Sequence, residues 1–132
     1  MRYIALSFVG IYILFAYWQI NDPDPVWWVT LYLVPAFISF KAFQQKYNLE
    51  LLVTLLVLYI ANALNSWLQI STYEGFFTED EGLSMKTYNQ ELVREAAGLG
   101  ICILTYIMYT IYYLFRKEYL DRTNNIVIPS ME

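Results

Sequence analysis

The sequence lacks histidine altogether and contains a single cysteine, Cys102, among its 132 residues. Without histidine the chain cannot form a His-ligated haem, zinc or copper site, a Ser-His or Cys-His nucleophile, or the usual proton switch near neutral pH. One cysteine cannot form an intramolecular disulfide or a CxxC redox pair. We therefore expect no catalytic residue, no metal ligand and no cofactor.

Charged residues are also scarce, at 15% of the chain, and the 8 basic residues are outnumbered by 12 acidic ones. A nucleic-acid partner is therefore not expected, because such binding depends on a concentrated positive field. Hydrophobic residues make up 58% of the chain, against about 45 to 50% in an average soluble domain. This composition favours a membrane protein, with membrane lipids as its first partners.

Four long segments that carry almost no charge predict four transmembrane helices, since about 20 apolar residues cross a bilayer. The first could instead be a signal peptide, but it is longer than the usual apolar core and lacks a small-residue cleavage site. The predicted spans are residues 3–20, 26–43, 49–70 and 96–115.

The connections between the spans differ in kind. Asn21 to Pro25 predicts a tight turn in which Asp24 caps the second helix and Pro25 takes its first position. Pro35 lies inside the second span and predicts a kink. Residues 71–95 are acidic and poorly periodic, which predicts a solvent-exposed loop.

Lysine and arginine counts predict the orientation. Two basic residues, Lys86 and Arg94, fall on one side of the four spans. Six fall on the other, which places both termini in the cytoplasm. The predicted fold is an all-α integral membrane protein, a four-span antiparallel helix bundle over residues 1–120, with a cytoplasmic tail at 121–132. The six basic residues are Arg2, Lys41, Lys46, Arg116, Lys117 and Arg122.

A polar stripe marks the third span, where Asn62, Asn65, Ser66 and Gln69 follow helical spacing. One interpretation is a pocket or polar pathway between helices, and the other is interhelical hydrogen bonding that holds the bundle. No charged residue lies deep in any span, so an ion pump or proton relay has little support.

The acidic residues of the predicted external side could bind a hard cation such as calcium, which prefers oxygen ligands. The stronger interpretation gives Asp24 the capping role, leaves Asp22 solvated and pairs Arg94 with a carboxylate. On the last span, Gly98, Cys102 and Thr105 form a track of small residues that allows close helix approach.

Several short motifs, read together, resemble the transmembrane protein 220 family over roughly residues 10 to 110. The resemblance implies a small multi-pass membrane protein and supplies no catalytic residue. The motifs are Asn21-Asp22-Pro23-Asp24, Val26-Trp27, Tyr32-x-x-Pro35-Ala36 and Arg94-Glu95-x-x-Gly98-Leu99.

Two of these motifs, the acidic turn at 21–24 and the pair Arg94-Glu95, fall on the same predicted side of the membrane. We therefore expect a latch in which the Arg94 guanidinium meets the carboxylate of Asp22 or Asp24 and fixes the first hairpin to the last helix.

These features predict a non-enzymatic accessory or assembly subunit that works with another integral membrane protein. The expected contact surface is the small-residue track or the acidic loop. The alternative is a small solute carrier or lipid-binding protein that uses the stripe of Asn62, Asn65 and Gln69. A third possibility, a membrane enzyme built on Asp22, Asp24, Arg94 and Glu95, has the least support.

The predicted orientation has a direct test. A cysteine placed at Gln45 in a Cys102→Ala background should stay unlabelled by an impermeant thiol reagent added to intact cells, because the turn at 44–48 is predicted to face the cytoplasm. A cysteine placed at Asn21 is the matched control and should react. Labelling at position 45 from outside would overturn the orientation.

Overall fold

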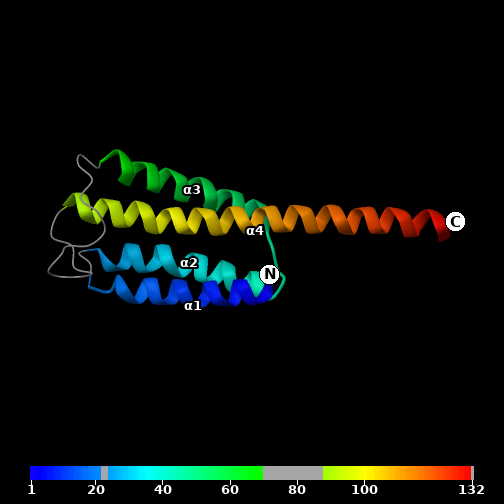
Figure 1. Cartoon of the computed structure of the whole chain (residues 1–132), viewed down its shortest axis with the longest axis horizontal. Coiled ribbons are helices and arrows are strands. Elements are labelled where there is room, and N and C mark those ends of the chain that lie inside the picture. Colours follow the sequence, from blue (N-terminus) through cyan, green and yellow to red (C-terminus); the bar gives the residue numbers. More distant parts are fainter. Residues whose placement is uncertain (22–23, 70–87, 132) are drawn as a thin grey trace. The chain divides into compact units, whose positions relative to one another are not determined.

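The computed structural model describes residues 1–21, 24–69 and 88–131, and the regular elements of these residues are four α-helices (Figure 1). The prediction of an all-α membrane bundle is confirmed, while the orientation of the termini stays a prediction. Three helices contain segments long and apolar enough to cross a membrane. The remaining helix, at the start of the chain, is shorter. Its 17 residues lie at the lower limit for a span. The helices are α1 (Arg2–Trp18), α2 (Pro25–Phe43), α3 (Leu49–Leu68) and α4 (Tyr88–Met131).

Helix α4 is much longer than the span predicted at 96–115. It has 44 residues, which correspond to about 66 Å of helix. Helix α4 begins inside the segment 71–95 that is predicted as a loop, and the predicted tail continues the helix. Strong helix formers follow the apolar run, and Arg122 bonds to Glu118 one turn earlier. The helix therefore leaves the hydrocarbon region without a break.

The residue contacts divide the chain into two units, which share α4. The first contains Met1–Glu50 and the part of α4 from Met108 onward, and the second contains Leu51–Ile107. We describe each unit by itself. That residues 1–120 form one domain stays a prediction.

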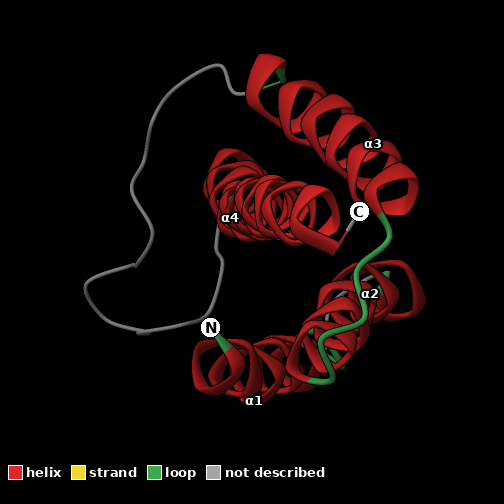
Figure 2. Cartoon of the chain, turned by 90° about the vertical axis from the view of Figure 1, so that its right-hand side faces the viewer, coloured by secondary structure: helices red, strands yellow, loops and turns green. Residues whose placement is uncertain are grey.

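In the first unit α1 and α2 form a helical hairpin and lie side by side (Figures 1 and 2). The buried face of α1 consists of Ala5, Tyr12 and Ala16, which fall on one side of a helix. The Phe15 ring meets the Tyr32 ring edge-on, with 5.5 Å between centroids. Small and aromatic side chains therefore interlock, which suits a bilayer, where association depends on close packing.

The second half of α4 completes this unit. The Tyr109 hydroxyl donates to the Ser39 hydroxyl of α2 at 2.7 Å, and both side chains are fully buried. Further along, Arg116 of α4 bonds to Gln45, just beyond α2. From the first contact to the second, the residue numbers rise on both partners, so α2 and this part of α4 run in the same direction.

In the second unit α3 pairs with the first half of α4. The Tyr59 and Tyr106 rings pack edge to face at 5.0 Å, and the Ser66 hydroxyl donates to the Glu95 carboxylate at 3.4 Å. From the first contact to the second, the residue number rises on α3 and falls on α4. The two helices are therefore antiparallel, as predicted for this pair.

One detail of α2 differs from the expectation. Asp24 occupies the N-cap position, but its side chain makes no capping hydrogen bond. Its ψ of 62° lies outside the extended region in which a cap side chain reaches the following N–H groups. In the first turn of the same helix, Trp28 is buried and Trp27 is exposed. Pro35 is buried and α2 continues through it; the kink stays a prediction.

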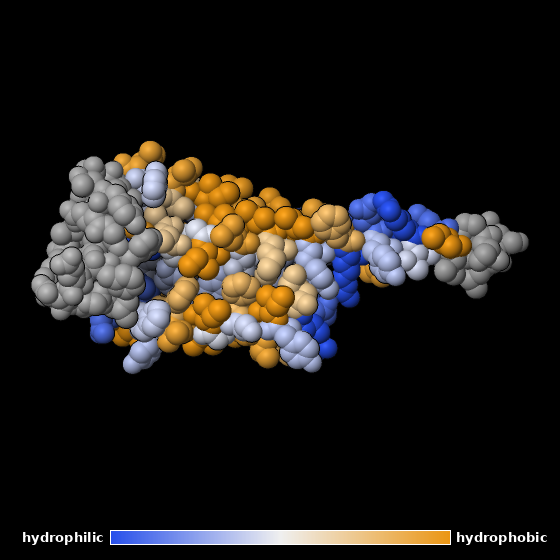
Figure 3. Space-filling model, viewed as in Figure 1, coloured by the Kyte–Doolittle hydropathy of each residue, from blue (hydrophilic) through white to orange (hydrophobic). Residues whose placement is uncertain are grey.

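Large apolar side chains cover much of the outer surface of the helices. On α3 they include Val57, Leu64 and Leu68, and Figure 3 shows hydrophobic surface along the helices and a mainly hydrophilic C-terminal part of α4. A soluble monomer rarely exposes so much contiguous apolar surface. This surface is therefore the one that lipid tails cover.

The buried bond between Tyr109 and Ser39 should hold α4 to α2. Tyr109→Phe should lower the free energy of unfolding in mixed detergent micelles by about 0.6 to 2 kcal/mol, because only the hydroxyl is lost. Ser39→Ala breaks the same bond, so the double variant should cost less than the sum of the two. Strict additivity of the two changes would contradict the bond.

Candidate functional site

In the polar stripe of α3, Asn62 and Gln69 each make a side-chain hydrogen bond within their own helix. The Asn62 side chain donates to the Leu58 carbonyl at 3.0 Å, and the Gln69 side chain donates to the Asn65 carbonyl at 3.2 Å. Both bonds stay within one helix, four residues apart. The Asn65 and Gln69 side chains are exposed. The amides therefore satisfy part of their hydrogen-bonding capacity locally, at little structural cost.

Ser66 is the member of the stripe that reaches another helix. Its side chain is buried, and its hydroxyl donates to the carboxylate of Glu95. The sequence contained both signals separately, since Ser66 belongs to the stripe and Glu95 to the family motif. Interhelical hydrogen bonding, one of the two interpretations left open, is therefore confirmed at this position.

Of the two aspartates in the predicted latch, the structure describes Asp24. Asp22 lies outside the described residues. Asn21 and Asp24 are exposed, whereas Arg94 is half-buried and belongs to the other unit. The contact between Arg94 and either aspartate stays a prediction. An open hollow of about 460 Å³ lies beside Asp24, Trp27 and Thr30, and its described walls come from the start of α2.

The small-residue track was wrongly predicted as a surface for a partner. Gly98, Cys102 and Thr105 are buried in the chain itself. The Thr105 hydroxyl donates to the Ile101 carbonyl at 3.0 Å within the same helix. Small side chains allow close packing, and this chain uses that property for its own packing. The other expected surface, the acidic loop at 71–95, lies largely outside the described residues.

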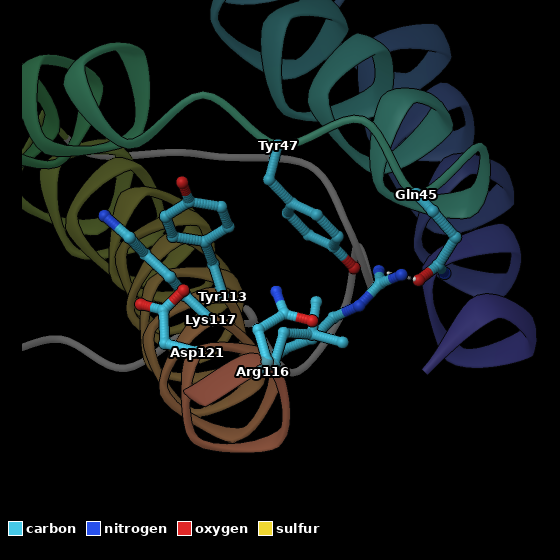
Figure 4. Close-up of a pocket in the computed structure, with 8 residues that line it drawn as sticks. Gln45, Tyr47, Tyr113, Arg116, Lys117 and Asp121 are labelled. Carbon is cyan, nitrogen blue, oxygen red and sulfur yellow. Dashed lines mark hydrogen bonds between the residues drawn. The ribbon is translucent and has the colours of Figure 1, made fainter. Parts of the chain in front are cut away.

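The structure shows an open hollow of about 380 Å³ in the first unit, lined largely by residues with polar or charged groups, which sequence reasoning missed. One wall comes from the turn after α2 and the other from a single face of α4 (Figure 4). Its basic residues served only to predict the orientation. The residues drawn and labelled in Figure 4 are Gln45, Tyr47, Tyr113, Arg116, Lys117 and Asp121.

Gln45 forms the turn in an unusual backbone conformation. Its φ is +62°, a left-handed position after a helix that usually holds glycine. The Lys46 N–H bonds to the Lys41 carbonyl at 2.9 Å and the Gln45 N–H bonds to the Ala42 carbonyl at 3.0 Å, which together form a Schellman motif. A glutamine in this conformation costs backbone energy, and the hydrogen bonds of its side chain offset that cost.

The Gln45 side chain connects the turn to α4. Its amide nitrogen donates to the Ala42 carbonyl at 3.3 Å, and its amide oxygen accepts from the Arg116 guanidinium (Figure 4). The Gln45 side chain therefore bonds to the end of α2 and also orients the Arg116 guanidinium.

Tyr47 lines the hollow and packs its ring against two tyrosines of α4. Its ring lies 5.7 Å from the Tyr112 ring and 6.0 Å from the Tyr113 ring, between centroids. The Tyr47 hydroxyl also donates to the Ala42 carbonyl, at 3.5 Å. Burial raises the pKa of the Tyr47 phenol above its usual 10, and nearby Tyr112 adds to the rise, whereas Arg116 opposes it. The phenol is therefore neutral at physiological pH and keeps its hydrogen bond.

The end of the first unit near the hollow is basic. The Arg2 guanidinium donates to the Phe43 carbonyl at 3.3 Å and lies 5.2 Å from the centre of the Phe43 ring. Lys41 lies over the Phe37 ring at 5.3 Å. Cations are favoured at a helix C-terminus, because it carries negative partial charge. These contacts also fix the first residues of α1 to the end of α2.

The described side chains contain no cluster of three or more Cys, Asp or Glu groups that could hold a metal ion. What they offer is a pair of cations, amides and phenols around one hollow. This arrangement can bind and orient an anion.

Comparison with known proteins gives one match. The family model described as "Transmembrane family 220, helix" matches residues 11–111. No curated protein and no solved structure matches the chain.

The strained turn can be tested with two variants at one position. Gln45→Gly and Gln45→Ala both remove the bonds of the side chain, but only glycine tolerates the left-handed backbone. The glycine variant should therefore be more stable than the alanine variant by about 1 kcal/mol in the free energy of unfolding in detergent micelles. Equal stability of the two would mean that the turn is not left-handed at this residue.

Proposed function

Because the chain belongs to transmembrane family 220, we propose that it is a non-enzymatic accessory or assembly subunit of a larger membrane protein complex. The observation that carries the proposal is an exposed apolar stripe that begins at the last residue of the apolar run of α4 and continues past it. Phe115, Tyr119 and Ile126 have exposed fractions of 68%, 69% and 74%.

These three residues share one face of α4. Their spacing is i, i+4 and i+11, which keeps them within a narrow sector at 100° per residue. Every side chain from Lys117 to Ile126 is exposed, so this part of the helix packs against little of its own chain. Apolar residues at helical spacing on an exposed helix are typical of docking to another protein.

Lipid is a poor cover for this stripe. Ile126 follows Phe115 by 11 residues, which places it about 16 Å further along the helix axis. The headgroup region adds only about 5 to 8 Å beyond the hydrocarbon on each side. Since α4 continues as one helix, the far end of the stripe lies in water unless a protein covers it. We propose that an apolar helix or groove of another membrane protein does so.

The competing carrier function has less support from the geometry. A solute pathway would need the amides of Asn62 and Gln69 to point into a cavity, but both donate to carbonyls of their own helix. A partner that binds α4 needs no internal cavity. The absence of enzymatic activity is part of the proposal and rests on the residue types present.

The proposal predicts that the stripe holds the complex together. The double variant Tyr119→Ser, Ile126→Ser should lose the larger species that the wild-type chain forms in mild detergent extracts of its native membrane, measured by native electrophoresis. Leu120→Ser is the matched control, because it replaces an exposed apolar residue that lies about 100° or more around α4 from the stripe, and it should keep the complex. Thermal midpoints of the purified variants should stay equal.

Three results would oppose this proposal. The first is a wild-type chain of 15.6 kDa that migrates alone from native membranes. The second is a complex that contains only copies of this chain. The third is transport of a solute by the purified chain in liposomes, with loss of that transport in the triple variant Asn62→Leu, Asn65→Leu, Gln69→Met.

A further inference from the structure

The hollow beside Tyr47 carries a charge distribution suited to an anion. Among its described lining residues, Arg116 and Lys117 are basic and Asp121 is the one acid. Arg116 and Lys117 are adjacent on α4, and Asp121 follows Lys117 by one turn. The hollow therefore offers two cations and a single carboxylate, which lies at the end further from the apolar run.

Arg116 is positioned before any ligand arrives. Gln45 accepts one of its hydrogen bonds, and the guanidinium has five donors. The side chain is half-buried, which limits its motion. A planar fork held in this way matches the oxygens of a phosphate, and charge-assisted bonds of this kind are the strong ones.

The place of the hollow at the end of the uncharged run is the depth expected for lipid headgroups. Arg116 directly follows Phe115, the last residue of the uncharged run 96–115. Lys41 and Arg2 mark the same end of the unit, and Arg2 bonds to the last residue of α2. Basic hollows between helices at this depth suit phospholipid headgroups.

We propose that this hollow binds one phosphate-bearing group, with the phosphate oxygens on Arg116 and Lys117 and a neighbouring hydroxyl or amine of the ligand on Asp121. The Tyr47 ring forms the wall, and the Asn124 amide adds a donor at the outer end. The ligand is a phospholipid headgroup or a soluble phosphate compound, which share this chemistry. The site does not depend on the proposed subunit role, because the lining residues occupy the face of α4 opposite Tyr119 and Ile126.

The test uses the delipidated full chain in detergent micelles, with phosphatidylglycerol and inorganic phosphate as separate probes and native mass spectrometry as the readout. One phosphatidylglycerol should bind per chain. Lys117→Gln and Arg116→Gln should each weaken binding about tenfold, since each removes a charge-assisted hydrogen bond. Lys117 is exposed, so its variant should fold even if loss of the bond from Arg116 to Gln45 unfolds the other. Lys117→Arg should retain binding.

Arg122→Gln is the matched control. It removes the same charge from the same helix, but Arg122 faces away from the hollow and bonds to Glu118. The affinity of this variant for phosphatidylglycerol should stay within about twofold of wild type, because an exposed charge outside the hollow is screened by salt and acts weakly. Saturable binding of inorganic phosphate that depends on Lys117 would identify a soluble ligand, and binding of phosphatidylglycerol alone would identify a lipid. Binding of neither probe, or equal losses with Arg122→Gln and Lys117→Gln, would overturn the site.

Discussion

In hydrocarbon a polar group without a partner is costly, because no water can replace the lost hydrogen bond, and this constraint organises the structure. The chain meets it in two ways. Asn62 and Thr105 bond to carbonyls one turn back on their own helices. Tyr109 instead bonds to Ser39 of a neighbouring helix in a fully buried pair. The local bonds leave the helices independent, and the pairs decide which helices associate.

Helix α4 takes part in the buried pairs that join it to α3 in one unit and to α2 in the other. Its first half meets α3 through Glu95 and Tyr106, and its second half meets α2 through Tyr109 and the turn through Arg116. The contact furthest along α4 is the bond from Arg116 to Gln45. The part of α4 beyond the apolar run begins directly there. The hollow and the apolar stripe therefore lie on an element whose position the buried contacts define.

The sequence predicts much of this fold and less of its site. Apolar runs identify the helices, because the bilayer requires each to satisfy its own backbone. Helix boundaries after 115 were missed, since Lys117 to Asn125 is polar and an isolated polar helix is marginal in water. Here the helix propagates from the span, where nucleation has already occurred. The hollow was missed because it depends on Gln45, a left-handed position where glycine is the usual signal.

The extension of α4 separates two kinds of contact by helical phase alone. Residues 113, 116, 117, 120, 121 and 124 fall on the face that lines the hollow, and residues 115, 119 and 126 fall on the opposite face. A charged ligand at headgroup depth needs the first face, and an apolar protein surface in water needs the second. Because the two faces do not overlap, occupation of one leaves the other accessible. A helix that is polar on most positions yet fully ordered by its span can therefore present both surfaces without a further domain.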